Sequence, residues 1–238
     1  MKAIILAAGL GSRLGKHTKN ISKCLLTLHG KPIIYHQLDI LSACGVDDVF
    51  IVTGYKGEQI EKTVGSRAKY YHYPDFALTN NLHTVNYCNH LIQDDILIIF
   101  SDVLVSYETM RNCVENVSDI ALLIDTDQNL PNTMRIRQKN GEIYDIGNHI
   151  QPSTGDGNFI GIAKFSIKGS KLLRENIEEI TYGDKHKTDY YTIVLPVIAA
   201  KGHTINIIPV NNNPWIEIDH IKEFEQACKM DFYLLSRN

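Results

Sequence analysis

Residues 2–23 read KAIILAAGLGSRLGKHTKNISK, and this stretch decides the fold class. Its first part, residues 2–7, is a short apolar run typical of a strand buried on both faces of a parallel sheet. A polar, glycine-containing segment follows directly and carries Arg13 and Lys23. A strand that ends in a glycine-rich loop lets backbone N–H groups point at an anion, because glycine permits close approach. The two basic side chains can then neutralise phosphate charge.

The glycine loop matches neither of two common nucleotide motifs. Leu14 stands where the dinucleotide fingerprint GxGxxG has its third glycine, and no Gly-Lys-Ser/Thr follows to make a P-loop. On local sequence alone, an anion-binding loop and a plain glycine turn explain the segment equally well.

Strands and helices alternate through the first half of the chain. Apolar runs predict strands at residues 2–7, 24–28, 48–54, 69–73, 96–100 and 119–125. Helices are predicted between them, one opened by Pro32 and closed by Gly45, the others at 57–64, at 80–92 and from Tyr107. This alternation indicates an α/β fold with a mostly parallel sheet and helices on both faces.

The second half is less regular. A hairpin is predicted around Asn140-Gly141, then strands at 159–165, 204–210 and 215–219, helices at 168–179, at 189–200 and from His220, and a turn at 211–214. No linker or repeat interrupts the chain, so one domain over residues 1–238 is the simplest account. We expect the second half to cover one edge of the sheet.

Composition excludes several function classes. The 238 residues suffice for one domain with a full core, and the net charge of −3 provides no basic field for nucleic acid or an anionic membrane. No apolar stretch approaches the ~20 residues of a membrane span, and the N-terminal run is too short for a signal peptide. Five scattered cysteines without a CxxC pair favour free thiols over disulfides or zinc. We therefore expect a cytoplasmic protein with neither nucleic-acid nor membrane partners.

Two aspartates are candidate metal ligands. Asp102 follows the apolar run 96–100, and in open parallel sheets ligands gather outside such strand ends. A carboxylate there suits Mg²⁺, although a loop aspartate near the next helix is the default interpretation without other evidence. In the segment WIEID, alternation places Trp215, Glu217 and Asp219 on one face. Asp219 also precedes the last predicted helix, so it is a candidate N-cap as well.

Taken together, these segments resemble the sugar-nucleotidyltransferase (NTP-transferase) superfamily. Its signature is Leu-Ala-Ala-Gly-x-Gly-x-Arg-Leu followed by a Pro-Lys pair, and this chain has LAAGLGSRL at residues 6–14 and then Ser22-Lys23. The lysine is present, but serine replaces the proline, which leaves the rigidity of the loop open. The resemblance continues through residues 31–55 and Asp102 to PWIEID at 214–219, and so covers nearly the whole chain.

The resemblance implies a Rossmann-like three-layer α/β/α sandwich with a mostly parallel mixed sheet. Within the superfamily the chain is most similar to the small cytidylyltransferases that act on phosphocholine, phosphonates and related compounds, because it is short and carries TNNLHT at residues 79–84. Such an enzyme transfers a nucleoside monophosphate from a triphosphate, here CTP by preference, to a small phosphorylated or phosphonate acceptor and releases pyrophosphate. Mg²⁺ is the implied cofactor, and a homo-oligomer is left open.

The same resemblance assigns roles to particular residues. It implies that Asp102 and Asp219 bind the metal, and that Arg13 and Lys23 stabilise the phosphates. The implied nucleotide-binding residues lie in the half formed by residues 1–125: Leu6, Ala7, Ala8, Gly9, Leu10, Gly11, Ser12, Asn80 and Thr84. The candidate acceptor-binding residues lie in the half formed by residues 126–238, which ends in the C-terminal helix: Gly161, Asp189, Tyr190, Tyr191, Trp215 and Glu217.

Three alternatives stay open at this point. A sugar-1-phosphate uridylyl-, guanylyl- or thymidylyltransferase keeps the chemistry and changes the substrates. A nucleotide-binding module without turnover keeps the fold, although both acidic and both basic residues are present. A glycosyltransferase of related fold usually carries a DxD pair, whereas residues 101–104 read SDVL and offer one carboxylate.

Overall fold

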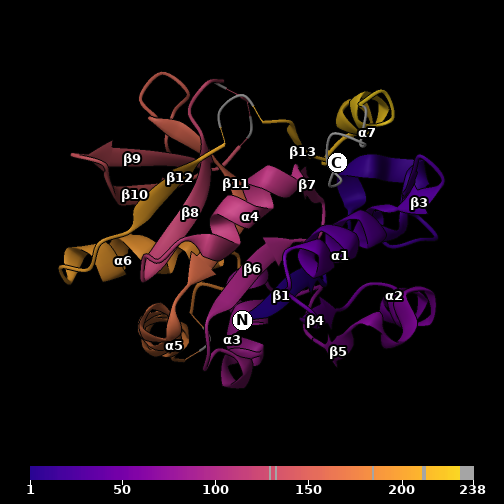
Figure 1. The fold of residues 1–238 in the computed structure, drawn as a ribbon. Coiled ribbons are helices and arrows are strands. Elements are labelled where there is room, and N and C mark those ends of the chain that lie inside the picture. The colour runs from indigo at the N-terminus through magenta and orange to yellow at the C-terminus, as the bar shows by residue number, and fades with distance from the viewer. Residues whose placement is uncertain (129, 132, 184, 211–212, 231–238) are drawn as a thin grey trace.

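The computed structural model describes residues 1–128, 130–131, 133–183, 185–210 and 213–230. A mixed sheet runs through the middle of this part of the chain, with helices packed against both faces (Figure 1). Its strands are β1 (Lys2–Ala7), β4 (Asp48–Thr53), β5 (Lys69–His72), β6 (Ile96–Phe100), β8 (Ile120–Asp125), β9 (Arg135–Lys139), β10 (Glu142–Gly147), β11 (Gly157–Phe165) and β12 (Asn206–Pro209).

The strand order is β10-β9-β11-β6-β1-β4-β5, and β8 joins β11 to β12. Strands β6, β1, β4 and β5 are parallel to one another, whereas β11 pairs antiparallel with both β6 and β8. The predicted mostly parallel mixed sheet is confirmed. The second half does more than cover an edge, because β11 hydrogen-bonds to β6 and extends the sheet.

Strand β1 shows why the first apolar run forms a central strand. Its alternate side chains enter two separate hydrophobic cores, with Ala3 and Ile5 on one face and Ile4 and Leu6 on the other. Each of these four side chains is at most 9% exposed. A continuous apolar run is required because both faces of the strand are covered.

The helices form the outer two layers of the sandwich. One core is covered by α1 (Ile33–Ala43), α2 (Gly57–Val64), α4 (Tyr107–Glu115) and α7 (Ile221–Ala227). The other is covered by α3 (Asn81–Tyr87), α5 (Ile167–Thr181) and α6 (Val194–Ala200). Two small sheets complete the fold, one from β2 (Thr27–Leu28) and β3 (Lys31–Pro32), the other from β7 (Val103–Val105) and β13 (Trp215–Glu217).

Several predicted boundaries were wrong. The predicted strand 24–28 is a 3₁₀ turn over Lys23–Leu25 followed by the short strand β2, because Cys24 and Leu25 reach the core from a turn. Pro32 precedes α1 instead of being its first residue. The predicted helix 80–92 ends at Tyr87 and resumes as a 3₁₀ turn, and the one at 189–200 starts as a 3₁₀ turn over Tyr191–Ile193.

Other predictions have different outcomes. The hairpin around Asn140-Gly141 is confirmed as β9–β10, and all five cysteines are free. Strand β7 was not predicted. Part of the predicted turn at 211–214 lies outside the described residues, since 211 and 212 are not among them. Within the described ranges, every helix is too short or too polar to cross a bilayer.

Candidate active site

The glycine loop leaves the carboxyl end of β1 in the middle of the sheet. Gly11 has φ 61°, a left-handed conformation that favours glycine, and its carbonyl oxygen accepts a 2.7 Å hydrogen bond from the Thr18 hydroxyl. On the other side, the Ala8 carbonyl accepts a hydrogen bond from Tyr55 N–H at 3.1 Å. In the described part of the chain, the N–H groups of Gly9, Leu10 and Gly11 donate to no backbone carbonyl. They are therefore available to an anion.

The small β7–β13 sheet brings two distant carboxylates together. Asp102 lies in the turn between β6 and β7, and β13 pairs antiparallel with β7 so that Glu217 stands opposite Val103. The next step of this ladder is a 3.0 Å hydrogen bond from Ile218 N–H to the Asp102 carbonyl. Asp219 follows immediately, so strand pairing brings its backbone close to that of Asp102.

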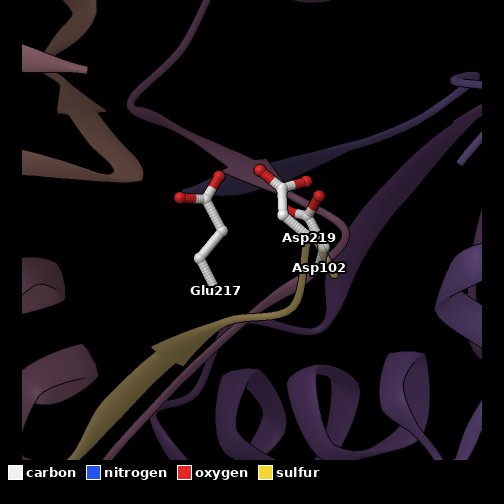
Figure 2. Close-up of side chains that lie close together, drawn as sticks. All are labelled: Asp102, Glu217 and Asp219. Atoms are coloured by element: carbon white, nitrogen blue, oxygen red, sulfur yellow. The ribbon is translucent and has the colours of Figure 1, made fainter. Parts of the chain in front are cut away.

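Asp102, Glu217 and Asp219 form one acidic cluster, which we call the acidic trio. Each offers a carboxylate oxygen, and the three oxygens lie within 4.8 Å of one another (Figure 2). Glu217 and Asp219 share a face of the β13 segment, as alternation predicted. The predicted N-cap role of Asp219 was wrong, because His220 is the N-cap residue of α7 and its N–H donates to Glu223 at 2.7 Å.

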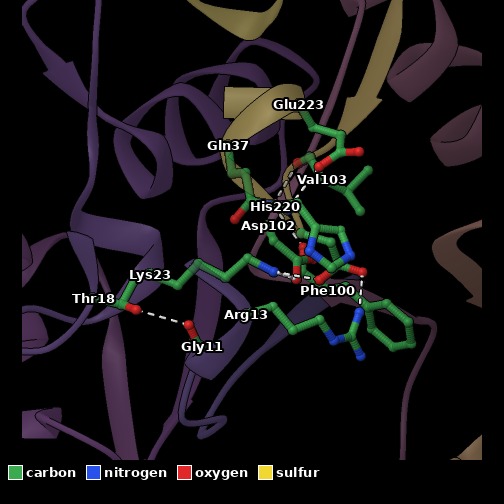
Figure 3. Close-up of polar contacts among 11 residues, drawn as sticks. Gly11, Arg13, Thr18, Lys23, Gln37, Phe100, Asp102, Val103, His220 and Glu223 are labelled. Atoms are coloured by element: carbon green, nitrogen blue, oxygen red, sulfur yellow. Dashed lines mark hydrogen bonds and ion pairs between the residues drawn. The ribbon is translucent and has the colours of Figure 1, made fainter. Parts of the chain in front are cut away.

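Two cations contact the trio (Figure 3). The Lys23 ammonium donates to Asp102 at 2.6 Å and to Asp219 at 2.7 Å, and its side chain is only 12% exposed. The Arg13 guanidinium forms an ion pair with the other oxygen of Asp219, with its side chain half exposed. Lys23 therefore joins the first half of the chain to the segment after β13 through a largely buried charge.

The electrostatics of these groups are coupled. Burial lowers the pKa of Lys23, but the charges of Asp102 and Asp219 outweigh burial and raise it overall. For Asp219, burial raises the pKa, but the charges of Lys23 and Arg13 outweigh burial and lower the pKa overall. For Glu217, burial and the negative charges of the two aspartates raise the pKa to about 8. Glu217 therefore keeps its proton near neutral pH in this arrangement, and the two cations pair with the two aspartates.

An open cavity of about 420 Å³ extends from this cluster along the glycine loop. It brings together most of the residues predicted for the site: Leu6, Ala7, Ala8, Gly9, Leu10, Gly11, Ser12, Arg13, Lys23, Asn80, Thr84, Asp102, Tyr190, Glu217 and Asp219. Sequence reasoning missed other lining residues: Phe76, Asn81, Phe100, Met134, Asn148 and Phe159. They come from loops, from strands and, for Asn81, from the start of α3, and their approach to the cavity depends on tertiary packing. The neighbouring Asn80 was the available signal for Asn81.

The segment after Thr79 is tied to the segment 185–191 of the second half. Asn80 caps α3 through its side-chain oxygen, and its amide donates to the Thr188 carbonyl at 3.0 Å. Asn81 accepts a hydrogen bond from Tyr191 N–H at 2.8 Å. This pairing places Tyr190 beside the glycine loop, where its contact with Arg13 contributes to raising the arginine's pKa, against the lowering effect of burial.

Four predicted acceptor residues do not line the cavity. Tyr191 is fully buried in the core, and Gly161 (φ 83°) packs behind Phe100, where an added Cβ would meet the ring at 2.7 Å. Trp215 donates from its indole to Asp125 at 2.9 Å. Asp189 pairs with His186 at 2.8 Å on the surface. These four residues are close in sequence to residues that line the cavity, but they do not contact the cavity themselves.

A second cavity of about 590 Å³ adjoins the first. It shares Arg13 and Asn148 with the first cavity and is also lined by Arg135 and His220. The shared residues place this second cavity beside the end of the first one that is lined by Arg13 and Asn148.

The acidic trio fits a divalent metal ion. One oxygen of Asp102, Oδ1, is buried and has no hydrogen-bond partner among the described residues. Carboxylate oxygens are the ligands that Mg²⁺ prefers. A buried unpartnered carboxylate oxygen is costly unless something positive reaches it.

A Rossmann-like sandwich with a glycine loop, an acidic trio and two cations around one cavity is the architecture of a nucleotidyltransferase. The comparison with family models agrees: the chain belongs to the MobA-like NTP transferase domain family, whose model matches residues 3–127.

Three proteins with similar sequences extend this comparison. A CTP:phosphoglutamine cytidylyltransferase from Campylobacter jejuni is 23% identical, over 94% of this chain and 98% of its own length. A CMP-5'-(3-aminopropyl)phosphonate synthase from Streptomyces rubellomurinus is 26% identical over 95% of this chain, which spans only 38% of that protein. Over 61 residues, 26% of this chain and 27% of the other, identity to a choline-phosphate cytidylyltransferase from Streptococcus pneumoniae reaches 48%.

Solved structures confirm the fold. The CTP:phosphocholine cytidylyltransferase of Streptococcus pneumoniae superposes with a TM-score of 0.84 at 20% identity, covering 96% of this chain and 97% of the other. The inositol-1-phosphate CTP transferase of T. maritima superposes with a TM-score of 0.78 at 18% identity, covering 96% and 95%. The predicted Rossmann-like fold is therefore confirmed.

Proposed function

We propose that this chain is a Mg²⁺-dependent cytidylyltransferase that transfers CMP from CTP to a small phosphorylated or phosphonate acceptor. The observation that carries the proposal is the convergence of Lys23, Arg13 and the acidic trio at one cavity beside the glycine loop. The relatives named as cytidylyltransferases support the choice of CTP and of this acceptor class.

The reaction needs positioning and charge stabilisation more than acid–base chemistry. An acceptor phosphate or phosphonate oxygen attacks the α-phosphorus of CTP and forms a new P–O bond. The bond to the β-phosphate oxygen breaks, and pyrophosphate leaves with that electron pair. Because the attacking oxygen is already anionic, no general base is required. The barrier arises from repulsion between two polyanions, which fixed cations and dipoles lower.

Each part of the site has a role in this scheme. The N–H groups of Gly9–Gly11 hold the triphosphate, Arg13 neutralises the departing pyrophosphate, and Lys23 bridges the α-phosphate and the incoming phosphate. Asn80, Thr84 and the backbone of Leu6–Ala8 face the base and ribose. Asp102 and Asp219, with Glu217 beside them, would hold Mg²⁺, which supplies Lewis-acid stabilisation of phosphate charge.

The proposed set of acceptor-binding residues is smaller than the set predicted from the sequence. Of the six predicted acceptor residues, Tyr190 and Glu217 line the cavity. An aromatic face can hold a quaternary ammonium and a carboxylate can hold a primary one. Tyr190 and Glu217 are therefore the acceptor-contacting residues we retain.

The test is a screen of pyrophosphate release with CTP, UTP, GTP and dTTP against a panel of acceptors. The panel holds phosphocholine, 3-aminopropylphosphonate, a phosphorylated glutamine and glucose-1-phosphate. The proposal predicts release with CTP and at least one of the first three, dependent on Mg²⁺. Release only with glucose-1-phosphate would show a sugar nucleotidyltransferase instead. CTP binding without release from any pair would show a binding module.

A further inference from the structure

A buried glutamine lies directly behind the turn that carries Asp102. Gln37 belongs to α1, is 3% exposed, and was assigned no role from the sequence. Its amide nitrogen donates to the Phe100 carbonyl at 2.8 Å and to the Val103 carbonyl at 2.7 Å (Figure 3). These two carbonyls flank Ser101-Asp102, so one side chain spans the turn.

The amide orientation of Gln37 follows from its partners. Both acceptors are carbonyl oxygens, so only the NH₂ end of the amide can face them. Its own oxygen, Oε1, is buried without a hydrogen-bond partner among the described residues. A buried unsatisfied carbonyl oxygen costs stability, and an apolar side chain of the same shape would avoid that cost. The two hydrogen bonds that the Gln37 amide donates to the turn offset this cost.

The Asp102 turn is held from two independent elements. Gln37 fixes the carbonyls on either side of Ser101-Asp102 from α1, while Ile218 N–H binds the Asp102 carbonyl from the β13 segment. By contrast, the Asp102 side chain has one partnered oxygen, bound by Lys23, and one without a partner. The backbone contacts therefore hold the turn from which this carboxylate projects, and Lys23 contacts the carboxylate itself.

We propose that Gln37 is a positioning residue that holds Asp102 at the distance from Asp219 and Glu217 needed for binding a divalent cation. This inference rests on the proposed metal role of the trio and extends it to a residue that touches neither substrate nor metal. Residues that orient metal ligands through hydrogen bonds typically change metal affinity by roughly 10- to 100-fold when they are replaced.

The test measures Mn²⁺ binding by electron paramagnetic resonance in the purified full chain, without acceptor. Gln37→Met removes both donors and keeps the length of the side chain, and Gln37→Asn keeps an amide that is too short to span both carbonyls. Asn176→Leu is the stability control, because Asn176 is a buried amide on α5 that donates to a backbone carbonyl far from the cavity. Thermal midpoints of all variants are measured alongside.

We expect both Gln37 variants to bind Mn²⁺ roughly 10-fold more weakly than wild type. Asn176→Leu should lose thermal stability but keep wild-type affinity. Wild-type affinity in a folded Gln37 variant would overturn the inference, as would an equal loss of affinity in Asn176→Leu. A wild-type chain that binds no Mn²⁺ would overturn both the inference and the metal role. If Mn²⁺ binds and responds to Gln37 but no triphosphate is turned over, the proposed function fails while the positioning role stands.

Discussion

The backbone N–H of Ile218 donates a 3.0 Å hydrogen bond to the carbonyl oxygen of Asp102. This bond joins the turn after β6 to the segment after β13, and it sets the two aspartates of the acidic trio side by side. Residues 1–125 and the later part of the chain therefore meet at the acidic trio. Every prediction about catalysis depends on this juxtaposition.

Replacing Lys23 should lower both the stability of the protein and its rate of catalysis. Lys23→Met leaves Asp102 and Asp219 close together without their shared cation, so the free energy of unfolding should fall by about 1–3 kcal/mol. Pyrophosphate release should fall by about 100-fold or more, because a cation next to the reacting phosphates is lost. Chemical denaturation and initial rates check the two effects.

Arg13→Met is the matched control for Lys23. Its side chain is half exposed, and exposed ion pairs contribute little to stability. We expect an activity loss of similar order with an unfolding free energy within about 0.5 kcal/mol of wild type. An equal loss of stability in both variants would assign the two cations the same structural role and contradict the account.

Tyr191→Phe should leave catalysis unchanged although Tyr191 was predicted to contact the acceptor. Its hydroxyl is buried without a partner among the described residues, and its ring lies 6.2 Å from Phe100 in an edge-on arrangement. Removing an unsatisfied buried hydroxyl should keep or slightly raise the thermal midpoint. Tyr190→Leu is the comparison, since it removes the aromatic face that lines the cavity, and it should raise KM for the acceptor. A selective loss of activity in Tyr191→Phe would restore its predicted role.

Glu217 should make the protein less stable as pH rises when no divalent cation is added. Burial and the two aspartates raise its folded pKa from 4.5 to about 8, so the folded state binds more protons than the unfolded state between these values. The free energy of unfolding must then decrease across that pH window, by up to about 5 kcal/mol for the full shift. Glu217→Gln should remove this slope relative to wild type. Denaturation at pH 5, 6.5 and 8 in chelator measures it, and parallel slopes in the two proteins would contradict the assignment.

The serine that replaces the superfamily's proline tests the rigidity of the loop. Ser22 has φ −65° and ψ 143°, which are the backbone angles proline prefers, and its N–H donates to no backbone carbonyl in the described ranges. Ser22→Pro should therefore raise the free energy of unfolding by about 0.4–1 kcal/mol by restricting the unfolded chain. Turnover should stay at the wild-type level. Destabilisation would show that the loop requires serine for another reason.

Sequence reasoning succeeded where local pattern and topology act together. The continuous apolar run of β1 predicted a strand buried on both faces. The position of Asp102 after β6 could be predicted to lie at the ligand-binding edge, because parallel strands end at one edge of the sheet. The meeting of Asp102 and Asp219 could be proposed only by resemblance, since the β7 strand that pairs with β13 is three residues long and was not predicted. Gln37 carried no signal in the sequence, because its role depends on how α1 packs against a distant turn.

The acceptor residues show the limit of the approach most clearly. Two neighbouring tyrosines lie in different environments. Tyr190 lines the cavity, whereas Tyr191 is buried in the core. A 3₁₀ turn begins at Tyr191, directly after Tyr190. The residue types alone could not predict which of the two side chains this turn directs toward the cavity.

The most direct test of the central claim is the rate of pyrophosphate release from CTP by Asp102→Asn and Asp219→Asn at saturating Mg²⁺. Each variant is measured with the acceptor identified in the screen and compared with wild type. If the two aspartates hold one catalytic metal ion, each substitution should lower turnover by about 100-fold or more. Wild-type turnover in either folded variant would contradict the account.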